Sequence, residues 1–405
     1  MDTRPKIEPP KARRVLSANF DASGFHFGIG LEDGFRLVHA ERALTVLNKD
    51  LAGGVGLVQM LDNTNYIALV GGGRMPKFAA TKASLVHLWV VIWDAVKDKA
   101  VGFITSKTPV RAVRLTRDKI VVVVQNSVEV YAWNKPKEPK ELDRLSVYET
   151  ADNLLGMICM SSKLAAFPGR TPGHVQIVEN DTGNVSIIPA HSTPLRAMAF
   201  SPKGELLATA SDHGTIIRIW NTRNCARICE LRRGWDSAAI FSLAFSSDGN
   251  LLACTSDKGT LHVFDVPDPE KLRELQSPSS PVSGAFPCSR PSATAAAVEN
   301  GKGKWGFLGK IPFMPRMFSD QYSFASAPFE MGDEPTTGGL PLLADNASLG
   351  TTKPQKGVLA WFDEETIHVV GAGLDARWEK FKVELDDEGR RCVRRVGWKR
   401  YCNDD

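Results

Sequence analysis

The sequence lacks any C-x-x-C pair, although the chain of 405 residues has seven cysteines. An odd number of cysteines argues against a disulfide framework and indicates a reducing compartment. No stretch reaches the roughly 18 uninterrupted apolar residues of a membrane-spanning helix. The N-terminal segment MDTRPKIEPPKARR also lacks the apolar core of a secretory signal. These absences predict a cytoplasmic protein that reaches membranes only as a peripheral protein.

A strong charge of one sign is also missing. Lys and Arg number 50 and Asp and Glu 46, which gives a net charge of +4. Nucleic-acid-binding proteins usually show a larger basic excess, so we expect no nucleic-acid partner, and a small anion site stays open. The eight histidines form no H-E-x-x-H motif, and Gly71–Gly73 lack the phosphate-loop spacing and indicate a turn. We therefore predict no enzymatic activity, no metal site and no cofactor.

What the sequence does contain is a repeat. Residues 194–221 (PLRAMAFSPKGELLATASDHGTIIRIWN) align with residues 242–265 (SLAFSSDGNLLACTSDKGTLHVFD). Phe200 and Phe245 are 45 positions apart, and so are Gly204 and Gly249. Each unit holds short runs of alternating apolar residues between turn residues, which is typical of strands. A period of about 40–45 residues with an aromatic-Asp/Asn end mark is typical of WD-type propeller blades.

Counting that end mark predicts the number of blades. The mark or its apolar equivalent falls at seven positions: Val38, Trp93, Trp133, Val178, Trp220, Phe264 and Val369. The strands of a pair of β-sandwiches, the alternative fold, do not repeat at this spacing. We predict an all-β chain: one domain over residues 1–405 that forms a seven-bladed β-propeller of WD-repeat type with four-stranded antiparallel blades.

Several segments interrupt the repeat. Residues 1–14 are expected to be a flexible N-terminus, 267–317 a long mobile membrane-facing loop of blade 6, and 331–356 a linker before blade 7. The loop contains a run rich in Ser, Pro, Ala and Gly, which buries too little apolar area to offset its ordering entropy. An apparent insertion near 83–89 is a lengthened strand, a surface excursion or an error in the gene prediction. Whether an N-terminal strand completes the last blade stays open.

An arginine pair gives the clearest sign of function. Leu231-Arg232-Arg233-Gly234 follows the mark at Trp220 by about ten residues, so it belongs to the outermost strand of blade 5. Neighbouring side chains of a strand point to opposite faces, so Arg232 and Arg233 are expected to face different grooves. Each groove is a candidate anion site. The alternative is a solvated basic edge that discourages pairing between sheets.

Polar residues near the pair favour anion binding. Blade 5 supplies His191, Ser192, Thr209, Ser211, Thr215 and Arg218, and blade 6 supplies Ser242, Thr255, Ser256, Lys258, Thr260 and His262. Arginine forks and hydroxyl donors suit phosphate oxygens. Each hydroxyl taken singly is also typical of a turn or of strand pairing. The duplicated set beside a divided arginine pair predicts two phosphate pockets.

At this point the sequence resembles the PROPPIN family, seven-bladed propellers that bind polyphosphoinositides and serve autophagy. The family's [F/L]-R-R-G hallmark is present as residues 231–234. Further matches are LVGGGRMPKF (69–78), FSDQYSFA (318–325) and GAGLDARWEKF (371–381), which together span almost the whole chain. The LVGGG-x-x-PKF and LRRG forms are most similar to one branch of the family.

The resemblance implies one headgroup in each pocket, phosphatidylinositol 3-phosphate or the 3,5-bisphosphate. By motif, the first pocket would use His191, Thr209, Ser211, Thr215, Arg218 and Arg232. The second would use Arg233, Ser242, Thr255, Ser256, Lys258, Thr260 and His262. If His262 contacts phosphate, the anion raises its pKa in the complex. Binding is then expected to strengthen from about pH 7.5 to 6.

The resemblance also implies that the long loop of blade 6 inserts into membranes. Its candidates are Phe286, Trp305, Phe307 and Leu308, whereas Tyr322 and Phe324 are expected to pack in the core. Members of the branch bind a lipid-transfer protein of autophagy through the first blades, and Asn19 and Asp21 match that motif in part. We expect a monomer that recruits autophagy machinery to pre-autophagosomal, endosomal or vacuolar membranes. The competing hypothesis is a WD-type scaffold that binds only proteins.

Overall fold

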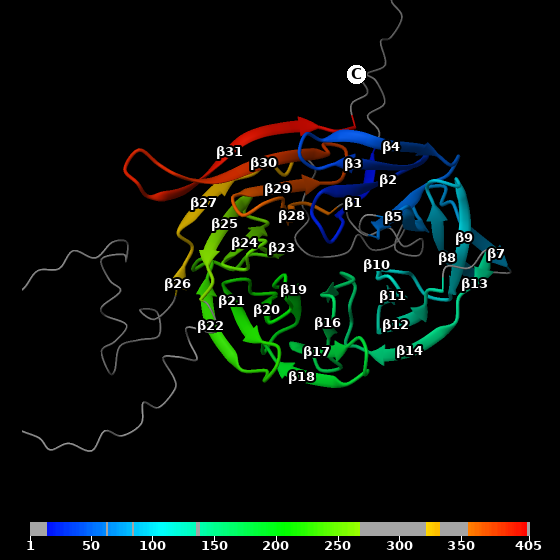
Figure 1. Cartoon of the computed structure of the whole chain (residues 1–405), viewed down its shortest axis with the longest axis horizontal. Coiled ribbons are helices and arrows are strands. Elements are labelled where there is room, and N and C mark those ends of the chain that lie inside the picture. The colour runs from blue at the N-terminus through cyan, green and yellow to red at the C-terminus, as the bar shows by residue number, and fades with distance from the viewer. Residues whose placement is uncertain are drawn as a thin grey trace, which may run out of the picture.

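The structure is a computed structural model that describes residues 14–61, 64–82, 85–134, 138–267, 321–332 and 355–402. Within these ranges the chain forms strands and no helix. The strands assemble into seven sheets around a ring, which Figure 1 shows from one end. The prediction of a seven-bladed β-propeller with mostly four-stranded antiparallel blades is confirmed.

The first four blades follow each other along the chain. Blade 1 holds β1 (Val15–Phe20), β2 (His26–Leu31), β3 (Gly34–His39) and β4 (Leu44–Asp50). Blade 2 holds β5 (Val55–Met60), β6 (Tyr66–Gly71), β8 (Leu85–Asp94) and β9 (Lys99–Ser106), extended by β7 (Ala79–Lys82) and β13 (Lys140–Glu141). Blade 3 holds β10 (Ala112–Leu115), β11 (Lys119–Val123), β12 (Ser127–Ala132) and β14 (Arg144–Glu149). Blade 4 holds β15 (Cys159–Met160), β16 (Leu164–Pro168), β17 (His174–Glu179) and β18 (Val185–Pro189).

The last three blades include blades 5 and 6, which carry the predicted site residues. Blade 5 holds β19 (Leu195–Phe200), β20 (Leu206–Ser211), β21 (Ile216–Asn221) and β22 (Arg227–Arg232), to which β26 (Gln321–Tyr322) adds in parallel. Blade 6 holds β23 (Ile240–Phe245), β24 (Leu251–Ser256), β25 (Thr260–Asp265) and β27 (Ala325–Pro328). Blade 7 holds β28 (Val358–Trp361), β29 (Thr366–Gly371), β30 (Arg377–Leu385) and β31 (Arg391–Arg400).

The core lies between blades, because every sheet packs both faces on its neighbours. The second strand of blade 5, β20, is buried at all six positions, whereas the outer strand β18 of blade 4 is mostly exposed. Trp220 packs toward blade 4, and Ile217 and Leu231 pack toward blade 6. Alternating apolar residues therefore fill two separate clusters, one on each side of a blade.

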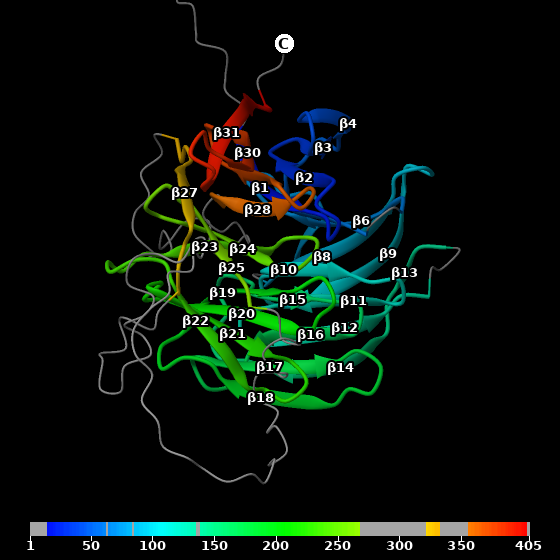
Figure 2. The same ribbon diagram turned by 60° about the vertical axis from the view of Figure 1, so that its left-hand side comes forward.

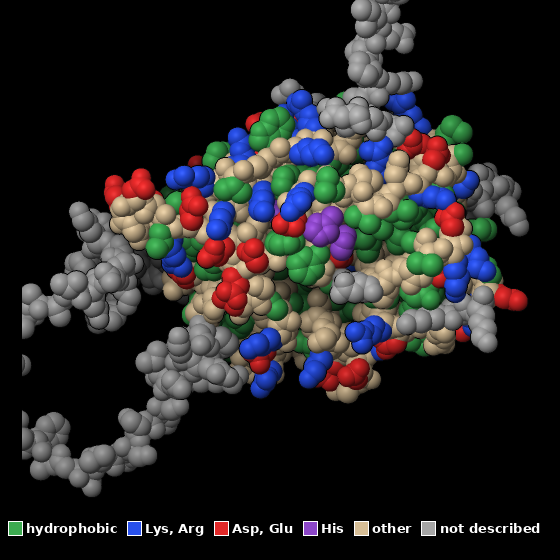
Figure 3. Space-filling view, turned by 45° about the horizontal axis from the view of Figure 1, so that its top comes forward, with side chains coloured by type: hydrophobic (Ala, Val, Ile, Leu, Met, Phe, Trp, Pro, Cys, Tyr) green, Lys and Arg blue, Asp and Glu red, His purple; other side chains and the backbone are tan. Residues whose placement is uncertain are grey.

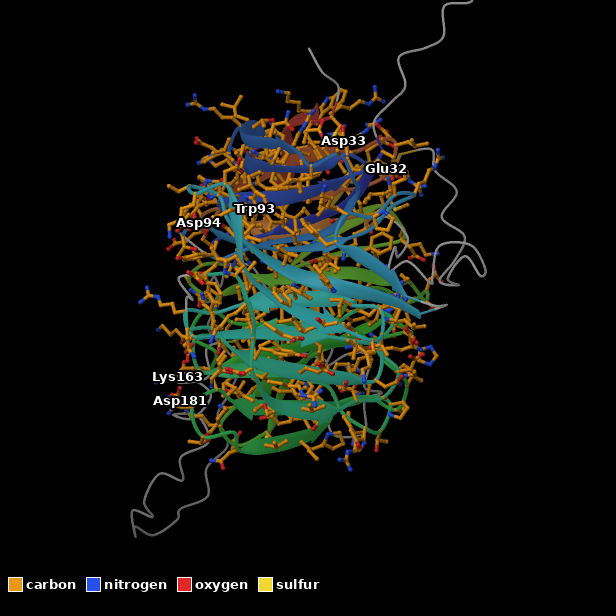
Figure 4. The ribbon with its side chains drawn as sticks, turned by 90° about the vertical axis from the view of Figure 1, so that its right-hand side faces the viewer. Glu32, Asp33, Trp93, Asp94, Lys163 and Asp181 are labelled. Atoms are coloured by element: carbon orange, nitrogen blue, oxygen red, sulfur yellow. The ribbon has the colours of Figure 1, made fainter. Side chains whose placement is uncertain are left out.

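The turns that connect the strands lie on two opposite faces of the ring. The carboxylate of Asp94, at the end of β8, accepts the backbone N–H groups of Val96 and Lys97 at 3.1 Å and the side-chain amide of Asn65. Burial acts to raise the pKa of Asp94, but these hydrogen bonds lower it overall. Figure 4 shows Asp94 along one face, and the turn at Glu32 and Asp33, between β2 and β3, on the other.

One of the seven end marks is wrong. Six of them lie in the third strand of a blade or directly after it, but Val369 lies in β29, the second strand of blade 7. By register, Phe381 in β30 pairs with Ile367 as Phe264 in blade 6 pairs with Leu252. The IHVV run misleads because a buried second strand has the same apolar pattern as the mark.

The ring closes without strand exchange in the part of the chain that the structure describes, because each end supplies its own blade. Val15 N donates to Gly373 O at 3.0 Å, and Gly373 N returns a bond to Val15 O at 2.9 Å. The Tyr401 hydroxyl donates to Gly371 O at 2.6 Å, and its ring lies 5.3 Å from that of Phe27. Blade 1 and blade 7 are thus joined by one β-bridge and a shared apolar cluster.

The structure also places the interruptions. Strand β7 pairs with the first half of β8, so residues 85–89 of the apparent insertion lengthen the third strand of blade 2, and residues 83–84 lie outside the described residues. The long loop leaves blade 6 after β25 and returns before β27. Residues 1–13, 268–320 and 333–354 lie outside the described residues, so the expected N-terminus, loop and linker stay predictions for those positions.

Candidate functional site

The arginine pair lies at the C-terminal end of β22, the outer strand of blade 5, which Figure 2 brings toward the viewer. Arg232 pairs with Ile216 and Glu230 with Arg218, so Arg232 shares the face of Arg218, which looks toward blade 4. Leu231, between them, is fully buried against blade 6. Arg233 follows on that second face, and its cation acts on Cys254 and His262 of blade 6.

In the part of the chain that the structure describes, Arg233 is held by backbone oxygens and not by a carboxylate. Its Nε donates to Gly214 O at 2.8 Å, and its Nη2 donates to Asp236 O. The side chain is only 8% exposed. Two bonds to neutral carbonyls fix the guanidinium at the end of the gap between blades 5 and 6, and its positive charge is not cancelled.

A compact polar cluster fills the gap between blades 4 and 5. Arg218 donates to Ala190 O at 2.6 Å, and its Nη1 lies 3.5 Å from His191 Nδ1. The other ring nitrogen of His191 lies 3.0 Å from Thr209 Oγ1. Burial, and then the Arg218 charge, lower the pKa of His191 to about 4. His191 is therefore neutral near pH 7 and takes part as a hydrogen-bonding group.

The sequence analysis missed a carboxylate in this cluster. Glu230 Oε1 accepts from Arg218 Nε at 2.9 Å and from Arg227 Nη1 at 2.6 Å. An incoming phosphate must compete with Glu230 for Arg218. A sign of this contact exists in the strand pattern, because Glu230 stands two positions before Arg232 and shares its face.

Among the described residues, no side-chain hydrogen bond joins Ser211 or Thr215 to this cluster. Ser211 ends β20 and is 7% exposed. The Thr215 carbonyl accepts the backbone N–H of Arg233 at 2.9 Å, which ties it to the turn of the second gap. The structure thus brings His191, Thr209 and Arg218 into direct contact, with Arg232 on the same face.

The gap between blades 5 and 6 repeats this arrangement with different side chains. His262 pairs with Cys254 as Arg218 pairs with Thr209, so His262 holds the place of Arg218 and Cys254 that of Thr209. The His262 ring nitrogens lie 3.2 Å from Thr260 Oγ1 and 3.1 Å from Ser323 Oγ. Ser256 is buried, and its Oγ accepts Lys258 N at 3.4 Å, while the Lys258 side chain is exposed.

His262 does not start from an ordinary histidine pKa. Burial, and then the Arg233 charge, lower the pKa of His262 to about 4. The ring is neutral between pH 7.5 and 6 in the unliganded protein. The expected strengthening of binding over that range stays a prediction, and it now requires that a bound phosphate raise the pKa of His262 from about 4.

Two expected members of the second pocket face the wrong way. Thr255 Oγ1 donates to Gly357 O at 2.5 Å, and Ser242 Oγ accepts Leu359 N at 3.2 Å. Both contacts lie toward blade 7, on the face of blade 6 opposite Arg233. By register, Ser242 and Thr255 correspond to Ala197 and Ala210 of blade 5. The sequence prediction matched these residues to the strands of blade 5 with an offset of one position. An offset of one residue along a strand assigns a side chain to the opposite face of the sheet.

Other expected contacts are placed as follows. Phe286, Trp305, Phe307 and Leu308 lie outside the described residues. Tyr322 is 44% exposed, so its expected core packing is wrong, whereas Phe324 is partly buried against the cluster between blades 6 and 7. Asn19 is half-buried in β1. The Asp21 carboxylate is turned inward, where it accepts His26 N at 3.3 Å.

Three arginines of β31 are paired with carboxylates. Around β31, Arg395 pairs with Glu379 at 2.9 Å, Arg394 with Glu384 at 3.2 Å and Arg400 with Asp375 at 2.7 Å. Figure 3 shows Lys and Arg mixed with Asp and Glu on the face that includes this strand. Within the described ranges, no helix is long and apolar enough to cross a membrane, and no three His, Cys, Asp or Glu side chains are grouped to hold a metal ion.

Comparison with known proteins assigns this chain to a family. The PROPPIN family profile matches residues 92–285. The SVP1-like protein 2 of Neurospora crassa is 46% identical over 437 residues, which cover 99% of both chains. The protein of the same description from Emericella nidulans is 50% identical over 84% of this chain and 98% of its own.

Solved structures share the fold. Kluyveromyces lactis Hsv2 has a TM-score of 0.68 at 19% identity and covers 96% of this chain and 99% of its own. A complex of KlAtg21 with the coiled coil of AgAtg16 has a TM-score of 0.60 at 15% identity, with the same coverage of both chains. With close relatives along nearly its whole length and the FRRG-type pair at the end of β22, this chain belongs to the PROPPIN family, β-propellers known for phosphoinositide binding in autophagy.

Proposed function

We propose that this chain binds two phosphoinositide headgroups, one in each gap beside blade 5, and so recruits autophagy machinery to membranes. The headgroup is phosphatidylinositol 3-phosphate or the 3,5-bisphosphate. The single observation that carries the proposal is that Arg232, the last residue of β22, lies on the face toward blade 4, whereas Arg233, the next residue, lies toward blade 6. One outer strand thereby offers a guanidinium to each of two separate polar gaps.

The first site combines Arg232 and Arg218 with His191 and Thr209, and with Ser211 and Thr215 nearby. A phosphate that bridges the two guanidiniums would take up hydrogen-bond donors that Arg218 now spends on Glu230. Charge-assisted bonds of an arginine fork to phosphate are about twice as strong as neutral ones. Arg218 would then pair with the phosphate, which carries more negative charge than the Glu230 carboxylate that it replaces.

The second site combines Arg233 with Ser256, Lys258, Thr260 and His262. Arg233 spends Nε and Nη2 on carbonyl oxygens, and no bond of its Nη1 is found in the described part of the chain. Thr260 and His262 lie on the same face, 3.2 Å apart. Ser242 and Thr255 are left out of this site because they bond to blade 7.

Two modest sites on one edge make a strong membrane contact. Once the first headgroup is bound, the second encounter is intramolecular, which raises overall avidity without new contacts. Basic residues near an anionic surface add about 1 kcal/mol each. Phe286, Trp305, Phe307 and Leu308 stay our candidates for insertion into the same bilayer. A contact with a lipid-transfer protein through Asn19 stays a proposal, whereas Asp21 is engaged by His26.

Flotation with liposomes tests the proposal. Arg232→Thr/Arg233→Thr is expected to fold as the wild type does but to lose binding to vesicles that carry either 3-phosphorylated lipid, because each pocket loses a cation. Each single variant keeps one site and is expected to bind at least tenfold more weakly, since avidity is lost.

The matched control removes two exposed arginines whose partners are on the surface. Arg170→Thr/Arg223→Thr breaks ion pairs with Glu149 and Glu205 that involve no residue of either pocket, and it is expected to bind as the wild type does. If the Arg232/Arg233 double variant still floats with the vesicles, a protein-binding scaffold without lipid recognition becomes the better account.

A further inference from the structure

Two exposed aromatic side chains flank the arginine pair, and no role in the two pockets uses them. Trp235, in the turn after β22, is 64% exposed, and Tyr322 in β26 is 44% exposed. They come from segments 87 positions apart in sequence (322 − 235). Single exposed aromatics are common on protein surfaces, so the question is what these two share.

What they share is Arg232. The Arg232 guanidinium carbon lies 5.2 Å from the centroid of the Trp235 ring. Strand β26 runs parallel to β22, with Tyr322 as the register partner of Arg232. Trp235 and Tyr322 therefore approach the same arginine, one from the following turn and one from the neighbouring strand. Ser323, next in the chain, bonds to His262 of the second site.

The turn that carries Trp235 is held firmly. Arg233 donates to Asp236 O, Ser237 Oγ donates to His213 O at 3.0 Å, and Ala238 N donates to the same oxygen at 3.1 Å. A Cβ at Gly234 would meet nothing within 4 Å, so the space beside the turn is open. The large apolar ring of Trp235 thus projects outward from a fixed backbone. This lowers the entropy cost of burying the ring against a binding partner.

We propose that Trp235 and Tyr322 form an interfacial anchor that enters the headgroup region of the same bilayer whose phosphoinositide is held by the arginines. This inference rests on the proposed function. Trp and Tyr concentrate at membrane–water interfaces because an apolar ring is joined to a polar group. The neighbouring cations Arg232, Arg233 and Lys258 match an anionic membrane surface. The anchor is separate from the four loop candidates between residues 286 and 308.

The experiment compares vesicle binding with binding of the free headgroup. The variants are Trp235→Ser, Tyr322→Ser and the double, tested on phosphatidylcholine vesicles with phosphatidylinositol 3-phosphate and on soluble inositol 1,3-bisphosphate. The double variant is expected to bind vesicles about tenfold more weakly, as for the loss of roughly 60 Å² of apolar contact. Its affinity for the soluble headgroup is expected to stay unchanged.

A matched control exists on blade 7. Trp398 is 54% exposed and lies 5.3 Å from the Arg377 guanidinium, so it repeats the local arrangement of Trp235 away from blades 5 and 6. Trp398→Ser is expected to leave vesicle binding unchanged. Trp235→Phe/Tyr322→Phe keeps the aromatic rings and is expected to retain most of the binding, which guards against variants that fold poorly.

Fluorescence gives a second readout. On vesicles, the emission lost on Trp235→Phe is expected to be blue-shifted and quenched by brominated lipid. Wild-type vesicle affinity in the double Ser variant would overturn the anchor and leave the headgroup function intact. An equal loss for the soluble headgroup would also overturn it, by placing the two residues inside the pocket. Failure of the wild type to bind vesicles or headgroup would overturn the proposed function and the anchor with it.

Discussion

Three histidines, His368 buried and His191 and His262 partly buried, share a lowered pKa. The pKa of His191, His262 and His368 is lowered to about 4, in each case by burial first and then by a nearby cation. His191 and His262 hydrogen-bond to threonine hydroxyls, whereas neither ring nitrogen of His368 has a partner among the described residues. Between about pH 4 and 6.5 these rings are neutral in the folded protein and become protonated on unfolding.

Replacement of His368 is expected to reduce acid sensitivity. The unfolded chain takes up a proton below about pH 6.5, while the folded state does so only near 4, so stability falls as pH falls between these values. At pH 5 this one residue, 0% exposed, costs about 2 kcal/mol of unfolding free energy. The His368 ring packs between Phe362 and Trp378. His368→Phe should remove the loss of unfolding free energy at pH 5.

Denaturant unfolding at pH 7.5 and 5 measures the difference. His213→Asn, which changes an exposed histidine in a turn, is the control and should keep the wild-type pH dependence. An equal loss of stability at pH 5 in the His368 variant and the wild type would contradict this account.

Side-chain direction was predictable at the arginine pair but not around it. Strict alternation along β22 is enough to separate Arg232 from Arg233. Two features depend on cross-strand register: the contact of Glu230 with Arg218, and the presence of Cys254 in blade 6 where blade 5 has Thr209. A one-residue offset changes that register. For the same reason Ser242 and Thr255 were assigned to a pocket that they do not face.

At the scale of elements, the returning segment of the long loop links three blades. β26 pairs with β22 of blade 5, and β27 pairs with β25 of blade 6. From blade 7, Arg391 bonds Asp265 with two donors at 2.7 and 2.5 Å and covers the Phe324 ring at 3.9 Å. The alternating pattern predicted the regular strands, but such short strands carry no pattern, and their pairing depends on contacts between distant segments.

Loss of Arg391 should loosen this segment locally. Arg391→Ala removes a clamp that is 44% exposed at the side chain, so we expect less than about 1 kcal/mol of global stability to be lost. Hydrogen exchange of the Phe324 amide, which donates to Val263 O at 3.0 Å, should speed up about tenfold. Arg390→Ala, which breaks only ion pairs within the hairpin, is the control. Unchanged exchange at Phe324 would show that the clamp does not hold the segment.

At the scale of the whole molecule, stability depends on the junction of blades 1 and 7. The 45-residue period was enough to predict seven blades, because each repeat must bury both faces on neighbours. Closure was not predictable, since nothing in a periodic pattern tells which blade receives the ends. The answer lies in non-periodic residues such as Tyr401, whose hydroxyl bonds to Gly371 O.

Tyr401 offers a direct test of the junction. Tyr401→Phe removes one buried hydrogen bond and should cost about 1 kcal/mol, whereas Tyr401→Ala also leaves a cavity and should cost about 3–5 kcal/mol. Equilibrium unfolding in urea measures both. Tyr322→Phe, the same change at an exposed site, should have no effect. A cost for Tyr401→Ala no larger than that for Tyr401→Phe would mean that the ring contact with Phe27 adds nothing.

Among the described strands, blades 1 and 7 meet without strand exchange, and this has a consequence for biosynthesis. The flank of blade 1 that carries Val15 and Phe27 is covered by residues of blade 7, which is the last blade to leave the ribosome. During almost all of translation the nascent chain is an open arc with two bare apolar ends. Premature termination within blade 7 would leave those ends uncovered, so truncated products should be targets for chaperones and proteases.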